Sequence, residues 1–322
     1  MPGDRGALVT PGGLREHSIW IPFRHSLNGV EGREGLLLEG PAGWGEISIL
    51  AGYPCEPRAA REAALEAAQQ GWPAPLRQRI PVNAMIPAVS PERAGQLGLA
   101  AHQAGYDCVK VKVGSGDDIG RVKAVRDAVG PRCLLRLDAN GAWELEEATA
   151  RVAALARFDL ELVEQPVATL EDLARLRRRV DVPLAADESV RGLDDARRLA
   201  RLEAADMVMV KVQPLGGVRK ALEVVEAAGV AGVVSSMLET SVGLAAGLAL
   251  AACLPELQYA CGLATAGLLA ADVTSDPLVP HGGVLQVRPV TPDPVLVGRL
   301  GRLGRLAGGR AVGRPAGPGR YL

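Results

Sequence analysis

The sequence lacks the charge pattern and the long apolar segments that would suit it to nucleic acid or to a membrane. Its 36 lysines and arginines are balanced by 37 acidic residues, so no basic field is available for either partner. The longest apolar run, 242–254, is too short to span a bilayer, and it predicts a buried helix. Residues 1–13 show no basic segment followed by an apolar run, so we expect no secretory signal and a cytoplasmic location.

Cysteine and histidine are also scarce. The five cysteines show no CxxC spacing and have no histidine nearby, so we expect reduced thiols rather than a disulfide framework or a zinc site. The four histidines lie outside the ends of the second to eighth strands assigned below, which makes a histidine base improbable. Only His25 could reach such a site, from a capping loop.

Five chargeable residues recur at nearly constant intervals, each at or just after the end of a short aliphatic run. Lys112, Asp138, Glu164, Asp187 and Lys211 are separated by 26, 26, 23 and 24 residues. Such an interval fits one strand, one helix and two short loops. If each interval is one βα unit, the five side chains converge at one end of a parallel barrel and form a reaction centre.

The repeated strand-then-helix pattern predicts the fold class. Eight strand candidates begin at residue 82: VNAMI, DCVKVKV, CLLRLDA, LELVEQP, VPLAADE, DMVMVKV, AGVVSS and ELQYACG. Helical periodicity between them favours an α/β fold of the (β/α)₈-barrel type. A doubly wound sheet is the alternative, but it would not place the ends of five consecutive strands around one point.

The sequence on either side of the barrel predicts a second domain. Residues 1–81 combine short strands with an alanine-rich helix from about 58 to 70, which predicts an α+β capping domain. The barrel is expected over 82–272. The segment of about 273–300 resumes short-strand character in PHGGVLQV and PVLV, so we expect it to complete the capping domain. The glycine- and arginine-rich segment 301–322 predicts a flexible tail.

The three carboxylates predict a metal site. A single carboxylate after a strand commonly caps the next helix. Three of them, Asp138, Glu164 and Asp187, follow successive strands, where uncompensated carboxylates would repel one another and require a cation. Only oxygen ligands are available, which indicates a hard ion, Mg²⁺ or Mn²⁺ in its place.

Two lysines on one strand predict a general base. Lys110 and Lys112 lie in VKVKV, where the period of two sends both to one face and the valines to the other. On a surface strand they would be solvated. Inside a barrel, two buried ammonium groups would depress each other's pKa, as a lysine base near neutral pH requires. Lys211, on the sixth strand, is expected on roughly the opposite side of the barrel from them.

Six motifs at consistent spacing carry a family resemblance. VKVKVG, DANGAW, VEQP, ADES, VKVQPLGG and SSMLETSVG occur in this order, over about residues 82–263. They resemble the enolase superfamily, specifically its muconate-lactonizing subgroup. The resemblance implies a capping domain over the barrel, Mg²⁺ held by Asp138, Glu164 and Asp187, and Lys112 and Lys211 as acid/base groups on opposite faces of a small carboxylate substrate. It also implies removal of a proton alpha to the carboxylate, giving an enediolate.

The resemblance leaves the overall reaction and the substrate contacts open. Dehydration, racemisation of N-acylated amino acids and lactonisation of muconate all suit this site. A non-catalytic barrel would be favoured by loss of any of the five charged residues, and none is lost. The segment YACGLATAG lacks the acidic pair by which dipeptide epimerases of the subgroup hold an ammonium group. The expected substrate contacts are Asn140, Ser235, Ser236, Gly262 and Leu263.

Overall fold

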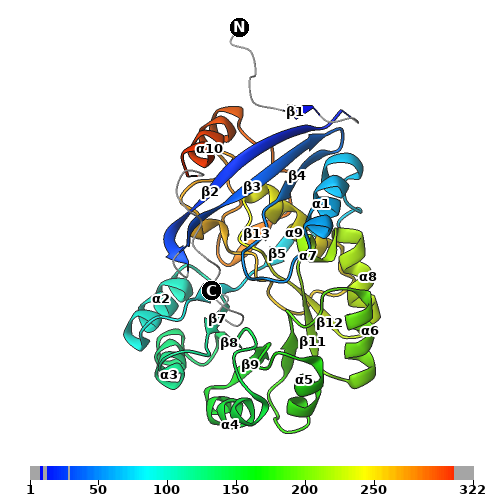
Figure 1. The fold of residues 1–322 in the computed structure, drawn as a ribbon. Helices are drawn as coiled ribbons and strands as arrows, with labels where there is room; N and C mark the ends of the chain where they lie inside the picture. The colour runs from blue at the N-terminus through cyan, green and yellow to red at the C-terminus, as the bar shows by residue number, and fades with distance from the viewer. Residues whose placement is uncertain (1–7, 10–12, 28–29, 308–322) are drawn as a thin grey trace.

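The N-terminal part of the chain forms an antiparallel sheet with a helix against it (Figure 1). The computed structural model describes residues 8–9, 13–27 and 30–307. The sheet contains β1 (Leu8–Val9), β2 (Arg15–Leu27), β3 (Val30–Gly40) and β4 (Gly43–Ile47), and α1 (Pro57–Leu65) runs on into a π-helical turn, Glu66–Gln70. At Gly45 a Cβ would lie 2.1 Å from the carbonyl oxygen of Ala64, so helix and strand are in direct contact.

A curled parallel sheet of seven strands follows, in the order β12-β11-β10-β9-β8-β7-β6. Its strands are β6 (Ala84–Ile86), β7 (Cys108–Lys112), β8 (Leu134–Asp138), β9 (Leu160–Glu164), β10 (Leu184–Ala186), β11 (Met207–Val210) and β12 (Ala231–Val234). Because sequential strands are neighbours throughout, their carboxyl ends meet at one mouth, and the predicted barrel-type fold is confirmed.

The eighth strand position is occupied by less regular structure than the sequence predicts. Only Cys261 and Gly262 pair there, Cys261 with Val82 on one side and Gly262 with Ser235 on the other. The preceding carbonyl, of Ala260, accepts a hydrogen bond of 2.6 Å from the Arg136 guanidinium inside the barrel instead of from a neighbouring strand. Two residues therefore bridge the two edges of the seven-stranded sheet.

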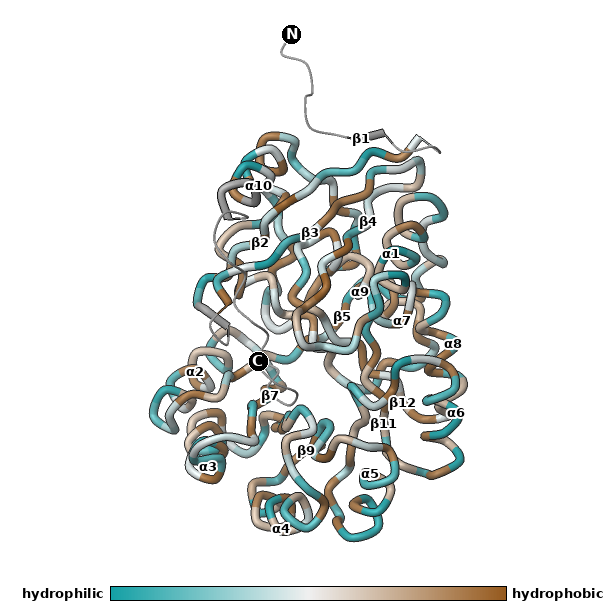
Figure 2. The backbone as a smooth tube through the Cα atoms, viewed as in Figure 1, coloured by the Kyte–Doolittle hydropathy of each residue, from teal (hydrophilic) through white to brown (hydrophobic). Residues whose placement is uncertain are grey.

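Helices surround the parallel sheet and bury its outer face. They are α2 (Pro91–Gln103), α3 (Asp118–Val129), α4 (Leu145–Leu155), α5 (Leu170–Arg177), α6 (Leu193–Leu202), α7 (Val212–Leu215), α8 (Val218–Ala228) and α9 (Ser241–Cys253). Figure 2 shows hydrophobic and hydrophilic residues alternating along the outer helices α2 to α6 and α8, as one-sided burial requires. Helix α9 is buried along its whole length, which confirms the buried helix predicted at 242–254. A separate small apolar cluster lies inside the barrel: Leu162, Ala185, Met207, Met209 and Val233.

The C-terminal segment returns to the N-terminal sheet, with one error in the prediction. Strand β13 (Val284–Gln286) pairs with β5 (Arg79–Pro81), but PVLV is the start of helix α10 (Pro294–Ala307), which packs on β2. A helix begins there because Asp293 accepts a 2.7 Å hydrogen bond from the Val295 amide and Pro294 occupies its first turn. Helix α10 covers the first part of the expected tail, and residues 308–322 lie outside the described residues.

Two further findings concern the cysteines and the length of the helices. All five cysteines are free thiols. In the portion of the chain that the structure describes, no helix combines the length and the apolar character needed to cross a membrane.

Candidate active site

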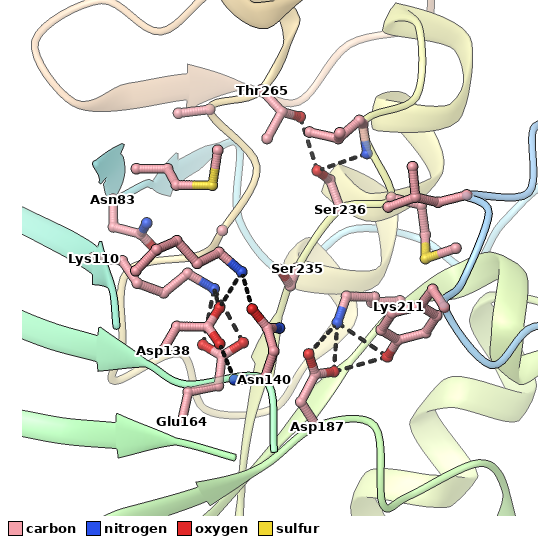
Figure 3. Close-up of a pocket in the computed structure, with 18 residues that line it drawn as sticks. Asn83, Lys110, Asp138, Asn140, Glu164, Asp187, Lys211, Ser235, Ser236 and Thr265 are labelled. Atoms are coloured by element: carbon pink, nitrogen blue, oxygen red, sulfur yellow. Dashed lines mark hydrogen bonds and ion pairs between the residues drawn. The ribbon is translucent and has the colours of Figure 1, made fainter. Parts of the chain in front are cut away.

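A cavity of about 50 Å³ lies at the carboxyl ends of the barrel strands (Figure 3). Ten of the predicted site residues line it: Lys110, Lys112, Asp138, Asn140, Glu164, Asp187, Lys211, Ser235, Ser236 and Gly262. Leu263 is not among its lining residues. The Leu263 side chain is fully buried against α9, where a Cβ on Gly247 would lie 2.8 Å from it.

Strand register places the three carboxylates side by side. Asp138 and Glu164 are partners across β8 and β9, and Glu164 is the partner of Ala185 on β10. Asp187 follows two residues after Ala185, so the three carboxylates come from the ends of three adjacent strands. Each of the three residues is at most 3% exposed. Such burial makes any uncompensated negative charge costly.

Lys110 lies between two of these carboxylates. Its Nζ is 3.0 Å from Asp138 Oδ2 and 2.9 Å from Glu164 Oε2. The inward orientation predicted for this lysine is found, with Val109 and Val111 buried on the other face of β7. The predicted pKa depression is wrong: burial lowers the pKa of Lys110, but the charges of Asp138 and Glu164 outweigh it and raise that pKa above its ordinary value.

Lys112 also points inward and is held by two oxygens of the DANGAW segment. Its Nζ lies 2.8 Å from Asp138 Oδ2 and 2.7 Å from Asn140 Oδ1. Asn140 has a φ of 46°, in the left-handed region that asparagine tolerates better than most residues. Its amide nitrogen Nδ2 in turn donates a 2.8 Å hydrogen bond to Glu188 Oε1. One asparagine therefore links the lysine of β7 to the loop after β10.

Lys211 forms a second group on the opposite side of the cavity. Its ammonium pairs with Asp187, at 2.5 Å from Oδ2, and donates to the hydroxyl of Tyr53 at 3.0 Å. Burial lowers the pKa of Lys211, but the charges of Asp187, Glu188 and Glu164 and the hydrogen bond to Asp187 together outweigh it, so its pKa also lies above the ordinary value. Figure 3 shows this group apart from the Lys110 group, with Asn140 between them. Two lysines thus approach the cavity from different sides.

The acids of the site outnumber its ammonium groups. Asp138, Glu164, Asp187 and Glu188 face three lysines, and burial together with the neighbouring Asp138 raises the pKa of Glu164 to about 8. Burial, followed by the charge of Asp187, raises the pKa of Glu188 to about 7. Across residues 8–9, 13–27 and 30–307, no three acidic, histidine or cysteine side chains converge closely enough to hold a metal ion. The lysine ammonium groups lie between the carboxylates.

The donor chemistry nevertheless fits a divalent cation. All candidate ligands are carboxylate oxygens on adjacent strand ends, the type of donor that Mg²⁺ prefers. With Glu188 the site holds four buried acids against three lysines, and burial, followed by the charge of Asp138, raises the pKa of Glu164, so the lysines alone do not neutralise the cluster. Asp138, Glu164 and Asp187 would hold such an ion.

Several lining residues were not predicted. Tyr53 and Leu50 come from the loop after β4, more than 50 residues before the first barrel lysine in the sequence. Asn83 lies two residues before Met85, so the two side chains share one face of the extended chain. Strand alternation in VNAMI could therefore have identified both as cavity-facing. Thr265 forms a 2.8 Å hydrogen bond with Ser236 between their hydroxyl groups. No local pattern marks Tyr53 or Thr265.

Comparison with known proteins agrees with the fold and with the motifs. Residues 93–293 match the family model described as enolase C-terminal domain-like, and residues 19–72 match the model described as enolase N-terminal domain-like. The chain therefore belongs to the enolase superfamily and is an enzyme of that superfamily, whose members generally use a divalent metal.

Individual relatives within the superfamily resemble this chain over most of its length. The chain is 54% identical to the o-succinylbenzoate synthase of Thermobifida fusca, over 84% of this chain and 86% of that protein. It is 46% identical to the o-succinylbenzoate synthase of Mycolicibacterium smegmatis, over 89% of both. The muconate lactonizing enzyme of Pseudomonas fluorescens shares the fold, with a TM-score of 0.81 at 21% identity over 92% of this chain and 99% of the other.

Proposed function

We propose that this enzyme catalyses the o-succinylbenzoate synthase reaction, a step of menaquinone biosynthesis. The substrate would be 2-succinyl-6-hydroxy-2,4-cyclohexadiene-1-carboxylate, and the product o-succinylbenzoate and water. The observation that carries the proposal is the likeness to relatives of that name at 54% and 46% identity, each covering more than four fifths of both chains. The grouping of the lysines and carboxylates around one cavity supports it.

We propose Lys112 as the base. It removes the proton from the ring carbon that bears the carboxylate, and the electrons left behind form an enediolate. The same lysine then returns the proton to the hydroxyl leaving the neighbouring carbon, so water departs and the ring becomes aromatic. Its position supports this role, because its Nζ already contacts two oxygens that line the cavity, on Asp138 and Asn140.

Lys211 is assigned electrostatic stabilisation. The raised pKa of Lys211 keeps this side chain an ammonium, which is the form that stabilises the negative charge of the enediolate. Lys110, whose pKa is also raised, contributes a second positive charge to the site. Mg²⁺, held by Asp138, Glu164 and Asp187, would supply additional positive charge at the substrate carboxylate. Mn²⁺ is the expected substitute.

A racemase is the second candidate, because Lys112 and Lys211 approach the cavity from different sides. Two bases on opposite faces of an alpha carbon are what racemisation of an N-acylamino acid requires. Muconate cycloisomerisation would use the same groups. We assign these reactions a lower rank because the relatives with the higher identity carry the synthase name.

The deciding experiment follows aromatic product absorbance with purified protein, Mg²⁺ and the cyclohexadiene substrate. We expect turnover by the wild type, its loss on chelation, and its recovery with Mg²⁺ or Mn²⁺. Lys112→Ala should lose both turnover and exchange of the alpha proton with solvent. Lys123→Ala is the matched control, since that lysine is exposed on α3 and pairs only with Asp127 among the described ion pairs. Absence of product from the wild type would refute the synthase, and racemisation of N-succinylamino acids under the same conditions would favour the second candidate.

A further inference from the structure

The loop that follows β4 brings a tyrosine into the barrel site. Tyr53 lies in the N-terminal part of the chain, yet its hydroxyl reaches two residues of the barrel mouth. It donates a 2.8 Å hydrogen bond to Asp187 Oδ1 and accepts one of 3.0 Å from Lys211 Nζ. The ring adds a contact of its own, because the Lys211 ammonium lies 4.3 Å from the ring centroid.

These contacts join a proposed metal ligand to a proposed acid/base group. Asp187 and Lys211 are separated by one βα unit, and each side chain has freedom to rotate about several bonds. Direct pairing brings the Lys211 ammonium against both Asp187 oxygens. A hydroxyl bound to both groups fixes the carboxylate plane and gives the ammonium a second acceptor outside the carboxylate.

We propose that Tyr53 is a positioning residue of the active site, whose hydroxyl orients Asp187 for the divalent cation and holds Lys211 toward the substrate. The inference rests on the proposed function in one respect, since it takes Asp187 as a ligand and Lys211 as the group facing the substrate. The contact comes from the loop after β4, so a residue outside the barrel reaches both groups.

The geometry distinguishes the hydroxyl from the ring. Tyr53→Phe removes both hydrogen bonds and keeps the ring beneath Lys211, whereas Tyr53→Leu removes the ring contact as well. Partners that hydrogen-bond a metal ligand typically change metal affinity or activity 10- to 100-fold when mutated. We therefore expect about a 10-fold weaker Mn²⁺ affinity and about a 10- to 100-fold lower kcat in Tyr53→Phe, with a larger loss in Tyr53→Leu.

The test measures Mn²⁺ binding by electron paramagnetic resonance without substrate, and turnover and thermal unfolding in parallel. Tyr106→Phe is the control for loss of a tyrosine hydroxyl, because Tyr106 is half-buried beside α2 and does not line the cavity. Weaker Mn²⁺ binding in Tyr53→Phe, at a wild-type melting temperature and with Tyr106→Phe unaffected, supports the proposal. Wild-type Mn²⁺ affinity in Tyr53→Phe overturns it, and so does an equal loss of affinity in both variants.

Failure of the proposed function would look different. If the wild type bound Mn²⁺ but formed no o-succinylbenzoate, the assigned reaction would be refuted while the Mn²⁺ affinities still reported on Tyr53. If the wild type formed product and Tyr53→Phe matched it in both turnover and Mn²⁺ affinity, only the role of Tyr53 would be refuted.

Discussion

Replacement of Glu46 should weaken the contact between the N-terminal sheet and the barrel and lower the stability of the protein. This buried carboxylate of β4 accepts hydrogen bonds from the Thr240 and Gly243 amides at 3.1 and 3.0 Å, at the start of α9. It also accepts from the hydroxyl of Ser48 at 2.6 Å. In Glu46→Ala the two amides lose their partner, and each buried unpaired donor costs about 1–3 kcal/mol. The loss of negative charge at a helix N-terminus adds to this cost.

The expected loss at pH 8 is about 3 kcal/mol of unfolding free energy, which corresponds to a fall in Tm of about 6 °C. Denaturant unfolding measures the first quantity and calorimetry the second. Glu34→Ala is the control, since Glu34 is exposed on the neighbouring strand β3. A loss below about 1 kcal/mol would refute the reasoning, because it would mean that α9 begins equally well without this carboxylate.

The contribution of Glu46 should also depend on pH. Burial raises the pKa of Glu46 to about 7 in the folded protein, against hydrogen bonds from Ser48 and Thr240 that lower it, compared with an ordinary value of 4.5. Between these values the folded state keeps a proton that the unfolded chain has released. The unfolding free energy of the wild type, relative to Glu46→Ala, should therefore fall as the pH rises from about 4.5 to about 7. A difference that rises with pH across this window would contradict the assignment.

Three further predictions concern packing, the barrel interior and specificity. Gly45→Ala should lower Tm by several degrees, because its Cβ would lie 2.1 Å from a backbone oxygen, whereas Gly267→Ala, with open space around it, should not. Arg136→Leu should cost about 3–5 kcal/mol in denaturant unfolding, since it leaves Glu161, its partner at 2.5 Å, without a counter-charge. Epimerisation of unacylated dipeptides should be at least about 100-fold less efficient in kcat/KM than the synthase reaction, since the segment 259–267 offers no carboxylate to a free ammonium; comparable values for both substrates would show that another residue supplies that charge.

The sequence is sufficient to predict the parts of this enzyme that follow from strand geometry. The alternation in VKVKV predicted that Lys110 and Lys112 share the inner face, and parallel register brought Asp138 and Glu164 together as partners. These results depend on local backbone geometry and on a regular repeat, both of which are visible along the chain. The start of α10 at PVLV was missed although Asp293 and Pro294 provide a recognisable helix start.

The pKa of Lys110 shifts in the opposite direction from the one predicted. Two neighbouring lysines were expected to lower each other's pKa, which treats them as an isolated pair. In the structure both lysines contact carboxylates, which the like-charge argument ignored. Lys110 Nζ lies within 3.0 Å of both Asp138 and Glu164. The sign of the shift is therefore decided by contacts across three strands, and strand pattern alone does not give their distances.

Contacts between the two domains are the part that the sequence could not supply. Tyr53 and Asp187 are 134 positions apart, and Glu46 and Thr240 are 194 apart. No periodicity relates such pairs, because they are set by how the N-terminal sheet sits on the barrel and not by either domain's own pattern. Each pair nevertheless ends at a segment that forms the site: Asp187 lines the cavity directly, and Thr240 follows the loop that supplies Met237 and Leu238. The barrel thus provides the proposed reacting groups in a predictable order, while the N-terminal domain provides the contacts to two of its mouth segments.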